Sequence, residues 1–212
     1  MIKLLKEANG NHPRTEKEKQ KMINTAAKHY AKFLTALGFD YTQDENSKDT
    51  PRRVAKAWVE DLISGCVNDA PKITTFPNRD KYPGLVMQSD IPVISLCSHH
   101  NLAFTGYAHI AYVPSTDGKV IGLSKLNRIV EFFARRPQLQ EALTMQIHDY
   151  LEKTMEGNLG VAVVLECRHT CCSHRGIGHD SVMRTAHLTG CFYDDEKSRS
   201  EFYNLLDRCK KA

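Results

Sequence analysis

The sequence predicts an α+β fold in which a mainly antiparallel sheet follows an N-terminal helical region. Residues 15–37 carry apolar side chains at steps of three and four, as an amphipathic helix does. From about residue 85 the pattern changes to apolar segments bounded by turn residues, which is typical of strands. The expected order is helices, a hairpin, two helices, two strands and a helix, and this order favours an α+β architecture. We therefore expect two regions, at residues 1–85 and 86–212.

The N-terminal region should hold two helices. The first should stop at Gly38, since glycine commonly follows the last turn of a helix. The second should cover residues 49–65 and end at Gly65. Thr50 is the expected N-cap of this helix, and Pro51 suits its first turn because proline lacks the N–H that a first turn leaves unpaired.

The C-terminal region should hold the sheet and three further helices. A loop with three prolines, residues 66–84, leads into it. Two helices lie between the strand pairs, the first stopped by Pro137 and the second marked by an apolar residue at every fourth position. The expected segments are strands at 91–97 and 106–114, a turn at 115–119 before 120–122, helices at 124–136 and from Leu139 to Met155, strands at 160–169 and 181–192, and a helix at 196–209.

Composition limits the classes of function. The chain has 212 residues, of which 41% are apolar and 25% charged, as in ordinary globular proteins. Its formal net charge of +4 suits a small anionic substrate and is too weak to indicate nucleic-acid binding. No apolar run is long enough for a transmembrane helix or a signal peptide, so we expect a cytoplasmic protein without a membrane partner. In a reducing compartment its seven cysteines should be thiols or metal ligands.

Two clusters of cysteine and histidine carry the chemical signal. The first is "CSHH", residues 97–100, and the second is "ECRHTCCSHRG", residues 166–176, at the end of the most apolar expected strand. Thiolate and imidazole are ligands that zinc prefers, and three protein ligands with an open fourth position are typical of catalytic zinc. A cysteine nucleophile with a histidine base is the competing interpretation, and small buried thiols are the unremarkable one.

A cationic helix start is the second signal. Ser124, Lys125 and Arg128 begin the helix expected at 124–136, and such a helix start is suited to phosphate. A solvated cationic face is the alternative. Glu141, early in the next helix, either complements the helix dipole or accepts two hydrogen bonds from an amidine-like edge such as that of guanine.

Three segments together resemble the GTP cyclohydrolase I family, in order, from about residue 49 to 206. They are "CSHHNLAFTGYAHIAYVP", "VIGLSKLNRIVEFFARRPQLQEALTMQI" and "GVAVVLECRHTCCSHRG". The resemblance implies a tunnelling fold, a four-stranded antiparallel sheet carrying two helices, as the catalytic domain at 86–212. It also implies a ring, a homodecamer of two stacked pentamers with sites at subunit boundaries. The implied reaction opens the imidazole ring of GTP at C8, releases formate and forms 7,8-dihydroneopterin triphosphate.

The same resemblance implies roles for particular residues and a Zn²⁺ cofactor. The implied zinc ligands are Cys97, His100 and Cys171, and the implied proton-transfer histidines are His99 and His169. The remaining residues would bind the substrate GTP, with Glu141 and Gln140 holding the guanine and the triphosphate surrounded by Ser124, Lys125, Arg128, Arg175, Arg53 and Lys56.

Three positions depart from the family pattern. Ser98 stands where the family usually has glutamate, Cys172 where it shows methionine, and Ala142 where many members have arginine. None of these changes removes an implied zinc ligand, so we expect a working enzyme. Two alternatives remain: a related enzyme with an altered product or substrate, and a catalytically silent ring that binds a purine or pterin.

Overall fold

The computed structural model describes residues 2–155 and 157–209, and they form two compact units, Met1–Ala70 and Pro71–Ala212. From the sequence pattern we expect a division at 85/86. The difference arises because β1 (Thr75–Pro77), in the segment expected as a connecting loop, pairs antiparallel with β4 (Lys119–Ile121) of the second unit. Within the described residues, every helix is too short or too polar to cross a membrane.

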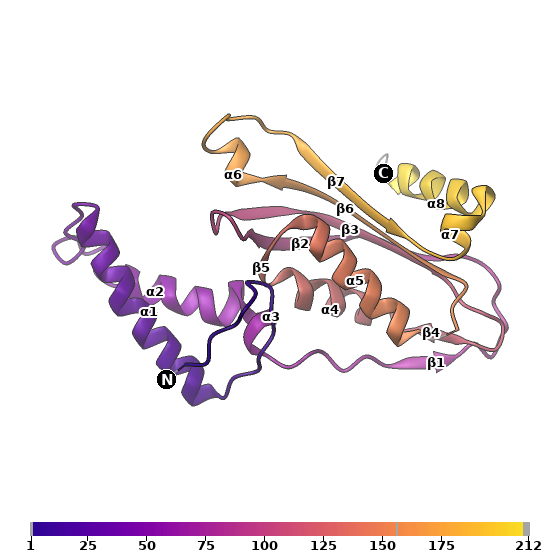
Figure 1. Ribbon diagram of the computed structural model, residues 1–212, viewed down its shortest axis with the longest axis horizontal. Helices are drawn as coiled ribbons and strands as arrows, with labels where there is room; N and C mark the ends of the chain where they lie inside the picture. Colours follow the sequence, from indigo (N-terminus) through magenta and orange to yellow (C-terminus); the bar gives the residue numbers. More distant parts are fainter. Residues whose placement is uncertain (1, 156, 210–212) are drawn as a thin grey trace. The chain divides into compact units, whose positions relative to one another are not determined.

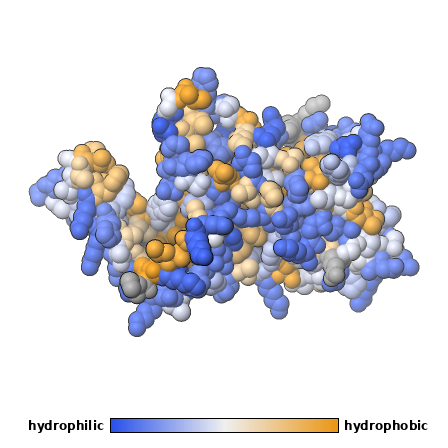
Figure 2. Space-filling view, in the orientation of Figure 1, coloured by the Kyte–Doolittle hydropathy of each residue, from blue (hydrophilic) through white to orange (hydrophobic). Residues whose placement is uncertain are grey.

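The first unit begins with the helix that the sequence predicts. Helix α1 covers Glu16–Ala36, and Thr15 and Glu18 close a reciprocal capping box at its start. Its buried residue Ile23 packs with Ala55 and Val59 of the following helical segment. Exposed apolar side chains also occur in this unit, including Phe33, Leu37 and Phe39, and hydrophobic residues gather over it on the face shown in Figure 2.

The second predicted helix is interrupted. Instead of one helix over residues 49–65, the chain forms α2 (Thr50–Ala57), a π-helical turn η1 (Trp58–Leu62) and α3 (Ser64–Val67). Thr50 is the first helical residue and not the N-cap, which is Asp49, and Gly65 lies inside α3. The π turn inserts an extra residue into the helical ladder, and an apolar pattern at three- and four-residue steps does not reveal such an insertion.

The sheet of the second unit contains the four antiparallel strands that were expected, with one short addition. These strands are β2 (Val86–Cys97), β3 (Ala103–Val113), β6 (Gly160–His169) and β7 (Val182–Leu188), in the order β2-β3-β6-β7. The two-residue strand β5 (Pro137–Gln138) adds a parallel partner to β2. The last strand ends at Leu188, earlier than predicted, because Gly190 turns with φ +54° and Cys191 begins α7 (Cys191–Asp194).

Segment 119–121 has a different partner from the one that the turn at 115–119 suggested. A turn after β3 normally returns the chain to pair with the strand before it. Here β4 leaves β3 and pairs with β1, whereas β3 pairs with β2 on one side and β6 on the other. The predicted turn at 115–119 is present, and the segment after it pairs with β1.

Helices cover both faces of the sheet. On one face lie α4 (Leu123–Ala134) and α5 (Gln140–Thr154), which contribute Ile129, Leu143 and Ile147 to the main core. The other face carries α7 and α8 (Glu196–Cys209), where Phe192 and Phe202 pack on the sheet. Figure 1 shows the sheet between these two pairs of helices. The strands and α5 thus form a rigid support, and the turns at the ends of β2 and β6 extend from it.

Candidate active site

The structure brings Cys97, His100 and Cys171 together. One ligand atom from each lies within 4.8 Å of the others. Cys97 is the last residue of β2, His100 lies in the turn that follows, and Cys171 lies in the short helix α6 (Thr170–Ser173) after β6. Because β2 and β6 both pair antiparallel with β3, they run in the same direction. Their C-terminal ends therefore lie at the same end of the sheet. Figure 1 shows α6 at this end of the sheet.

Hydrogen bonds hold the two segments in place. The backbone N–H of Asn101 donates to Cys97 O at 2.8 Å, and that of Cys97 donates to Leu102 O at 2.9 Å. Asn101 has φ +54°, a conformation that asparagine adopts more readily than most residues. Thr170 Oγ1 donates to Ala103 O at 2.6 Å, which ties α6 to β3. The positions of the three candidate ligands therefore follow from the sheet register and one tight turn.

The donor set fits a divalent ion of zinc-like softness. Two thiols and one imidazole converge, with Cys97 buried, Cys171 half-buried and His100 exposed, which leaves one side open to a substrate. Burial raises the pKa of Cys171 to about 11, and the neighbouring Cys97 thiol adds to the rise. A cation between the two sulfurs would reverse this effect by stabilising the thiolates. Arg175 Nη1 donates to His100 Nε2 at 2.9 Å, so in this arrangement Nε2 is the acceptor nitrogen and Nδ1 carries the ring proton. An ion bound at Nε2 would replace this hydrogen bond.

His169 lies beside this group in a defined orientation. Its ring stacks on Phe104, with centroids 4.5 Å apart and planes 11° apart. Its Nε2 is 2.9 Å from Gln140 Oε1. Burial lowers the pKa of His169, an effect that the carboxylate of Glu141 partly opposes. The ring is therefore held neutral over a wider pH range than a free histidine.

Gln140 determines which nitrogen of His169 carries the proton. The Gln140 side chain is 1% exposed. Its Nε2 lies 3.2 Å from Leu165 O and 3.1 Å from Met183 O, and both are pure acceptors. The amide nitrogen must therefore face these carbonyls, and Oε1 must face His169. Since Oε1 can only accept, Nε2 of His169 donates and its Nδ1 keeps a lone pair. The resemblance implied that Gln140 holds guanine, but the structure commits its amide to protein groups.

The other predicted site residues divide into two sets. Arg175 lies at the metal-ligand group, as described, and Glu141 lies in the first turn of α5 next to Gln140. His99 is exposed, with its ring centroid 6.2 Å from that of His100. These residues lie around the end of the sheet at which β2 and β6 terminate.

The predicted phosphate residues on α4 lie far from this end of the sheet. Asn127, between Lys125 and Arg128, accepts a hydrogen bond of 2.5 Å from Gln88 near the start of β2. Cys97 is at the other end of that strand, roughly 25–30 Å away at about 3.3 Å per residue. Within one chain, the start of α4 and the metal-ligand group therefore lie at opposite ends of the sheet.

Arg53 and Lys56 lie on α2 in the first unit. Each forms an exposed ion pair within its own helical segment, Arg53 with Asp49 and Lys56 with Glu60, both at 3.6 Å. Such exposed pairs contribute little and leave both cations available to a ligand.

Two cysteines of the second cluster are not ligands in this arrangement. Cys167 is 1% exposed in the core beneath the sheet, and burial raises its pKa to about 12. Cys172 is exposed next to Cys171. Phe104, the stacking partner of His169, was not among the residues predicted from the sequence. Its pairing with His169 in the β3–β6 register is not visible in the sequence.

Comparisons with known proteins identify the family of this chain. The family model described as GTP cyclohydrolase I matches residues 26–207. A GTP cyclohydrolase 1 from Sulfurihydrogenibium sp. (strain YO3AOP1) is 44% identical over 84% of this chain and 92% of its own length. One from Flavobacterium johnsoniae is 44% identical over 91% of this chain and 83% of its own, and one from Vibrio cholerae is 40% identical over 91% and 86%. The solved structure of the archaeosine synthase QueF-Like in the apo form matches with a TM-score of 0.39 and 16% identity, over 50% of this chain and 94% of that chain, too low a likeness for any argument.

Proposed function

The chain belongs to the GTP cyclohydrolase I family and is an enzyme with that activity; we propose that its active centre forms around Cys97, His100 and Cys171. The reaction opens the imidazole ring of GTP at C8, releases formate and gives 7,8-dihydroneopterin triphosphate, a step in pterin and folate biosynthesis. The observation that carries the placement is the convergence of these three side chains within 4.8 Å, next to a histidine of fixed orientation.

Zn²⁺ is the proposed cofactor, held by the two thiolates and the His100 imidazole. When bound, such an ion supplies Lewis-acid chemistry and lowers the pKa of water, which provides a nucleophile at neutral pH. The donor set supports zinc over magnesium or calcium, which prefer oxygen ligands. The open, exposed side of the group at His100 leaves room for the purine.

The protein groups around this centre would handle protons. His169 keeps its proton on Nε2, so its Nδ1 is the atom that accepts a proton from the substrate as bonds rearrange. Gln140 acts through His169, as a positioning residue. Glu141, in the first turn of α5, is the proposed acceptor for the guanine edge, where a carboxylate receives two N–H groups. His99, exposed in the same turn as His100, is proposed as the second proton-transfer group.

We propose that the triphosphate site is completed by a second copy of the chain. Ser124, Lys125 and Arg128 belong to the cationic start of α4, which lies at the far end of the sheet from Cys97 in its own chain. A substrate that contacts both groups must therefore lie between two chains. Arg175, next to His100, would approach the phosphates from the metal side. Arg53 and Lys56 of α2 are proposed as further phosphate contacts.

The strand order supports a closed ring. Within the described part of the chain, no strand pairs with the outer edge of β7, and β5 pairs with only two residues of β2. Open edges of this kind are normally covered or paired, and pairing β7 of one chain with β2 of the next would close a barrel. A decamer of two pentamers, in the tunnelling fold, is the assembly that we propose.

The proposed compartment is the cytoplasm. Among the residues with described side chains, Cys97, Cys167, Cys171, Cys172 and Cys191 are free thiols. Free thiols in this number suit a reducing environment.

A metal and activity assay on three variants tests the proposal. The purified zinc-loaded protein should convert GTP to formate and to a pterin that fluoresces after oxidation. Cys171→Ala should lose both bound metal and turnover, whereas His99→Ala should keep the metal and lose turnover. His29→Ala, an exposed position in the first unit, is the matched control. Full activity of Cys171→Ala with metal still bound would contradict the proposed centre.

A further inference from the structure

A second group of polar side chains lies between α5 and the edge strand β7. Polar side chains lie at every fourth position of α5, and they face polar side chains at every second position of β7. In the β6–β7 register His187 pairs with Val163, a core residue, so this face of β7 points toward α5. Thr144 Oγ1 lies 2.6 Å from Thr185 Oγ1, and the rings of His148 and His187 are 4.1 Å apart. This row of polar contacts begins at Gln140 and continues away from the active site.

At the far end of the row, His148, Asp149 and His187 form a compact group. Their candidate ligand atoms all lie within 4.8 Å of one another. The His148 side chain is 2% exposed and that of Asp149 is 54% exposed, so the group extends from the interior to solvent. His148 lies about 12 Å along α5 from Gln140, at about 1.5 Å rise per residue. The group is therefore separate from the site at Cys97.

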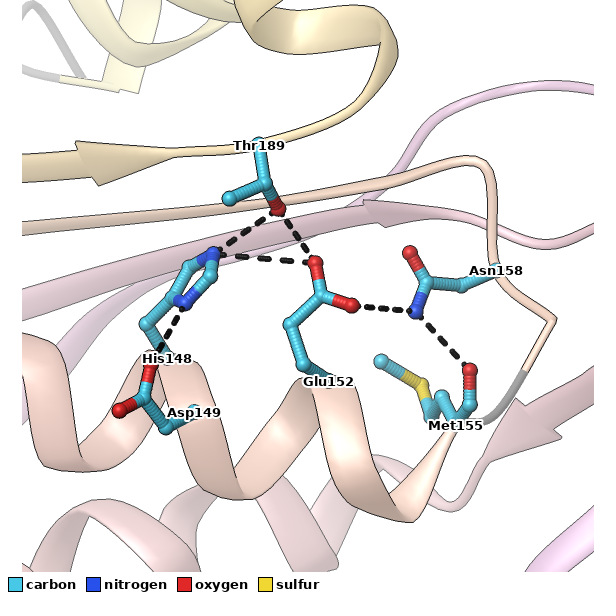
Figure 3. Close-up of polar contacts among 6 residues, drawn as sticks. All are labelled: His148, Asp149, Glu152, Met155, Asn158 and Thr189. Carbon is cyan, nitrogen blue, oxygen red and sulfur yellow. Dashed lines mark hydrogen bonds and ion pairs between the residues drawn. The ribbon is translucent and has the colours of Figure 1, made fainter.

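Hydrogen bonds around His148 determine its tautomer. Thr189 donates its hydroxyl hydrogen to Glu152 Oε1, and Asn158 Nδ2 donates to Glu152 Oε2 at 3.2 Å. The single hydroxyl hydrogen of Thr189 is thus used, so Thr189 Oγ1 accepts from His148 Nε2 at 3.0 Å. Figure 3 shows this chain from His148 through Thr189 to Glu152 and Asn158. The remaining nitrogen, Nδ1, then carries a lone pair.

The lone pair on His148 Nδ1 faces a carboxylate. Asp149 Oδ1 is 3.4 Å from it, as the dashed line in Figure 3 marks. In the tautomer that Thr189 selects, no ring proton lies between these two atoms. Two acceptors that face each other without a proton between them favour a cation at that place.

We propose that His148, Asp149 and His187 bind a divalent transition-metal ion at a second site, distinct from the one at Cys97. Two ligands of one tetrahedral ion, each at about 2.0–2.1 Å, are about 3.3 Å apart, which matches the separation of His148 Nδ1 and Asp149 Oδ1. Two imidazoles and a carboxylate suit zinc, cobalt or nickel.

The surroundings of the ring have the form that metal-binding histidines require. The nitrogen opposite the ion normally donates to a carboxylate or another acceptor, which fixes the ring. Here His148 Nε2 donates to Thr189, and Thr189 in turn donates to Glu152. The bound ion would join α5 to β7 and thereby stabilise the folded chain against unfolding.

Cobalt(II) binding tests the proposal and separates the two sites. Equilibrium dialysis of the full-length wild type should give two ions per chain. The thiolate site shows a sulfur-to-cobalt charge-transfer band, and the histidine–carboxylate site shows none. The double variant Cys97→Ala/Cys171→Ala should therefore bind one ion without that band. His187→Ala should bind one ion and keep the band.

Asp149→Asn and His29→Ala complete the design. Asp149 is exposed and the amide has the same shape, so Asp149→Asn should fold normally. It should lower the affinity for the second ion at least tenfold. His29→Ala removes an exposed histidine elsewhere and should still bind two ions. One ion per wild-type chain with the charge-transfer band, or two ions at unchanged affinity in both His187→Ala and Asp149→Asn, would overturn the proposal. Failure of the double variant to bind any ion would overturn it as well, whatever the fate of the thiolate site.

Discussion

Gln140 is a buried side chain whose hydrogen-bonding groups are all engaged by neighbours. Its amide nitrogen faces the carbonyls of two adjacent strands, β6 and β7, and its oxygen faces His169. One amide thus joins the end of the sheet to the candidate proton-transfer group. The family pattern marks this position as functional, but the function that the geometry supports is to orient His169.

Replacing Gln140 with leucine should therefore affect both activity and stability. Without Oε1, His169 is no longer confined to one tautomer, so kcat for GTP should fall about 10–100-fold. The unpaired buried carbonyls should lower the free energy of unfolding by about 1–3 kcal/mol. Steady-state kinetics, metal analysis and urea unfolding measure these effects. The metal content should not change, and Gln43→Leu, on the surface of the first unit, is the control. An unchanged kcat in Gln140→Leu would show that His169 needs no orientation.

The cysteines should differ in reactivity according to their surroundings. Cys172 is exposed, whereas Cys167 is 1% exposed and burial raises its pKa to about 12. Because the thiolate is the reactive form, iodoacetamide should modify Cys172 first and leave Cys167 unmodified in the native protein. Peptide mass spectrometry should also show that added Zn²⁺ protects Cys97 and Cys171. Equal labelling of Cys167 and Cys172 would contradict the buried position of Cys167.

At the scale of elements, the sheet depends on a close approach of β3 and β6 at Gly106. A Cβ atom at this position would overlap the carbonyl oxygen of Glu166 and lie 2.7 Å from Cys167 Cα. Both obstacles are backbone, which cannot move without opening the strand pair. This contact lies on the strands that carry the active-site segments, so it couples strand packing to the site.

Gly106→Ala should lower the free energy of unfolding by about 1–3 kcal/mol or more, because it overpacks a site with no room to relax. Gly122→Ala is the matched control, since an added Cβ there would meet only side-chain atoms at 3.6 Å and 3.8 Å. Urea unfolding of both variants provides the measurement. Equal stability of the two would mean that β3 and β6 are not so closely packed.

The sequence predicted most of these elements but fewer of the pairings between them. Hydrophobic periodicity identified the long helices and the four main strands, because burial of one face dominates each pattern. It gave no sign of the short helices α6 and α7. It missed the π turn after α2 and the pairing of β4 with β1, since both depend on contacts that a local pattern does not encode. The cysteine and histidine clusters indicated a metal site, and the resemblance to the GTP cyclohydrolase I family selected the three candidate ligands. The orientation of His169 required the register of β3, β6 and β7.

One signal in the sequence was overlooked. Thr185 and His187 of β7 alternate with Thr189, just after its end, and Gln140, Thr144 and His148 recur every fourth residue on α5. Each pattern places polar residues on the face of its element that is otherwise apolar. Two such patterns in neighbouring elements predict a buried polar row, and the structure contains one.

At the scale of the whole molecule, a single chain cannot assemble all of the predicted substrate groups. The cationic start of α4 and the metal-ligand group lie at opposite ends of the sheet, and the edges of that sheet remain open. A symmetric ring resolves both features, because each interface then combines the start of one α4 with the metal-ligand group of the adjacent chain.

Mixed oligomers test this arrangement. Arg128→Ala and Cys171→Ala should each be nearly inactive alone, since one lacks a phosphate contact and the other a metal ligand. In oligomers assembled from equal amounts of both, about a quarter of the interfaces should combine two intact halves and recover activity. Mixing Cys97→Ala with Cys171→Ala should recover none, because both changes affect the same half. No recovery in the first mixture would show that each site lies within one chain.

The central claim is that Cys97, His100 and Cys171 share one ion, and X-ray absorption at the zinc edge tests it most directly. The sample is His187→Ala loaded with one equivalent of Zn²⁺, so that the second site does not contribute. Two sulfur atoms at about 2.3 Å and nitrogen or oxygen atoms at about 2.0–2.1 Å are the predicted ligands. A first shell without sulfur would contradict the account.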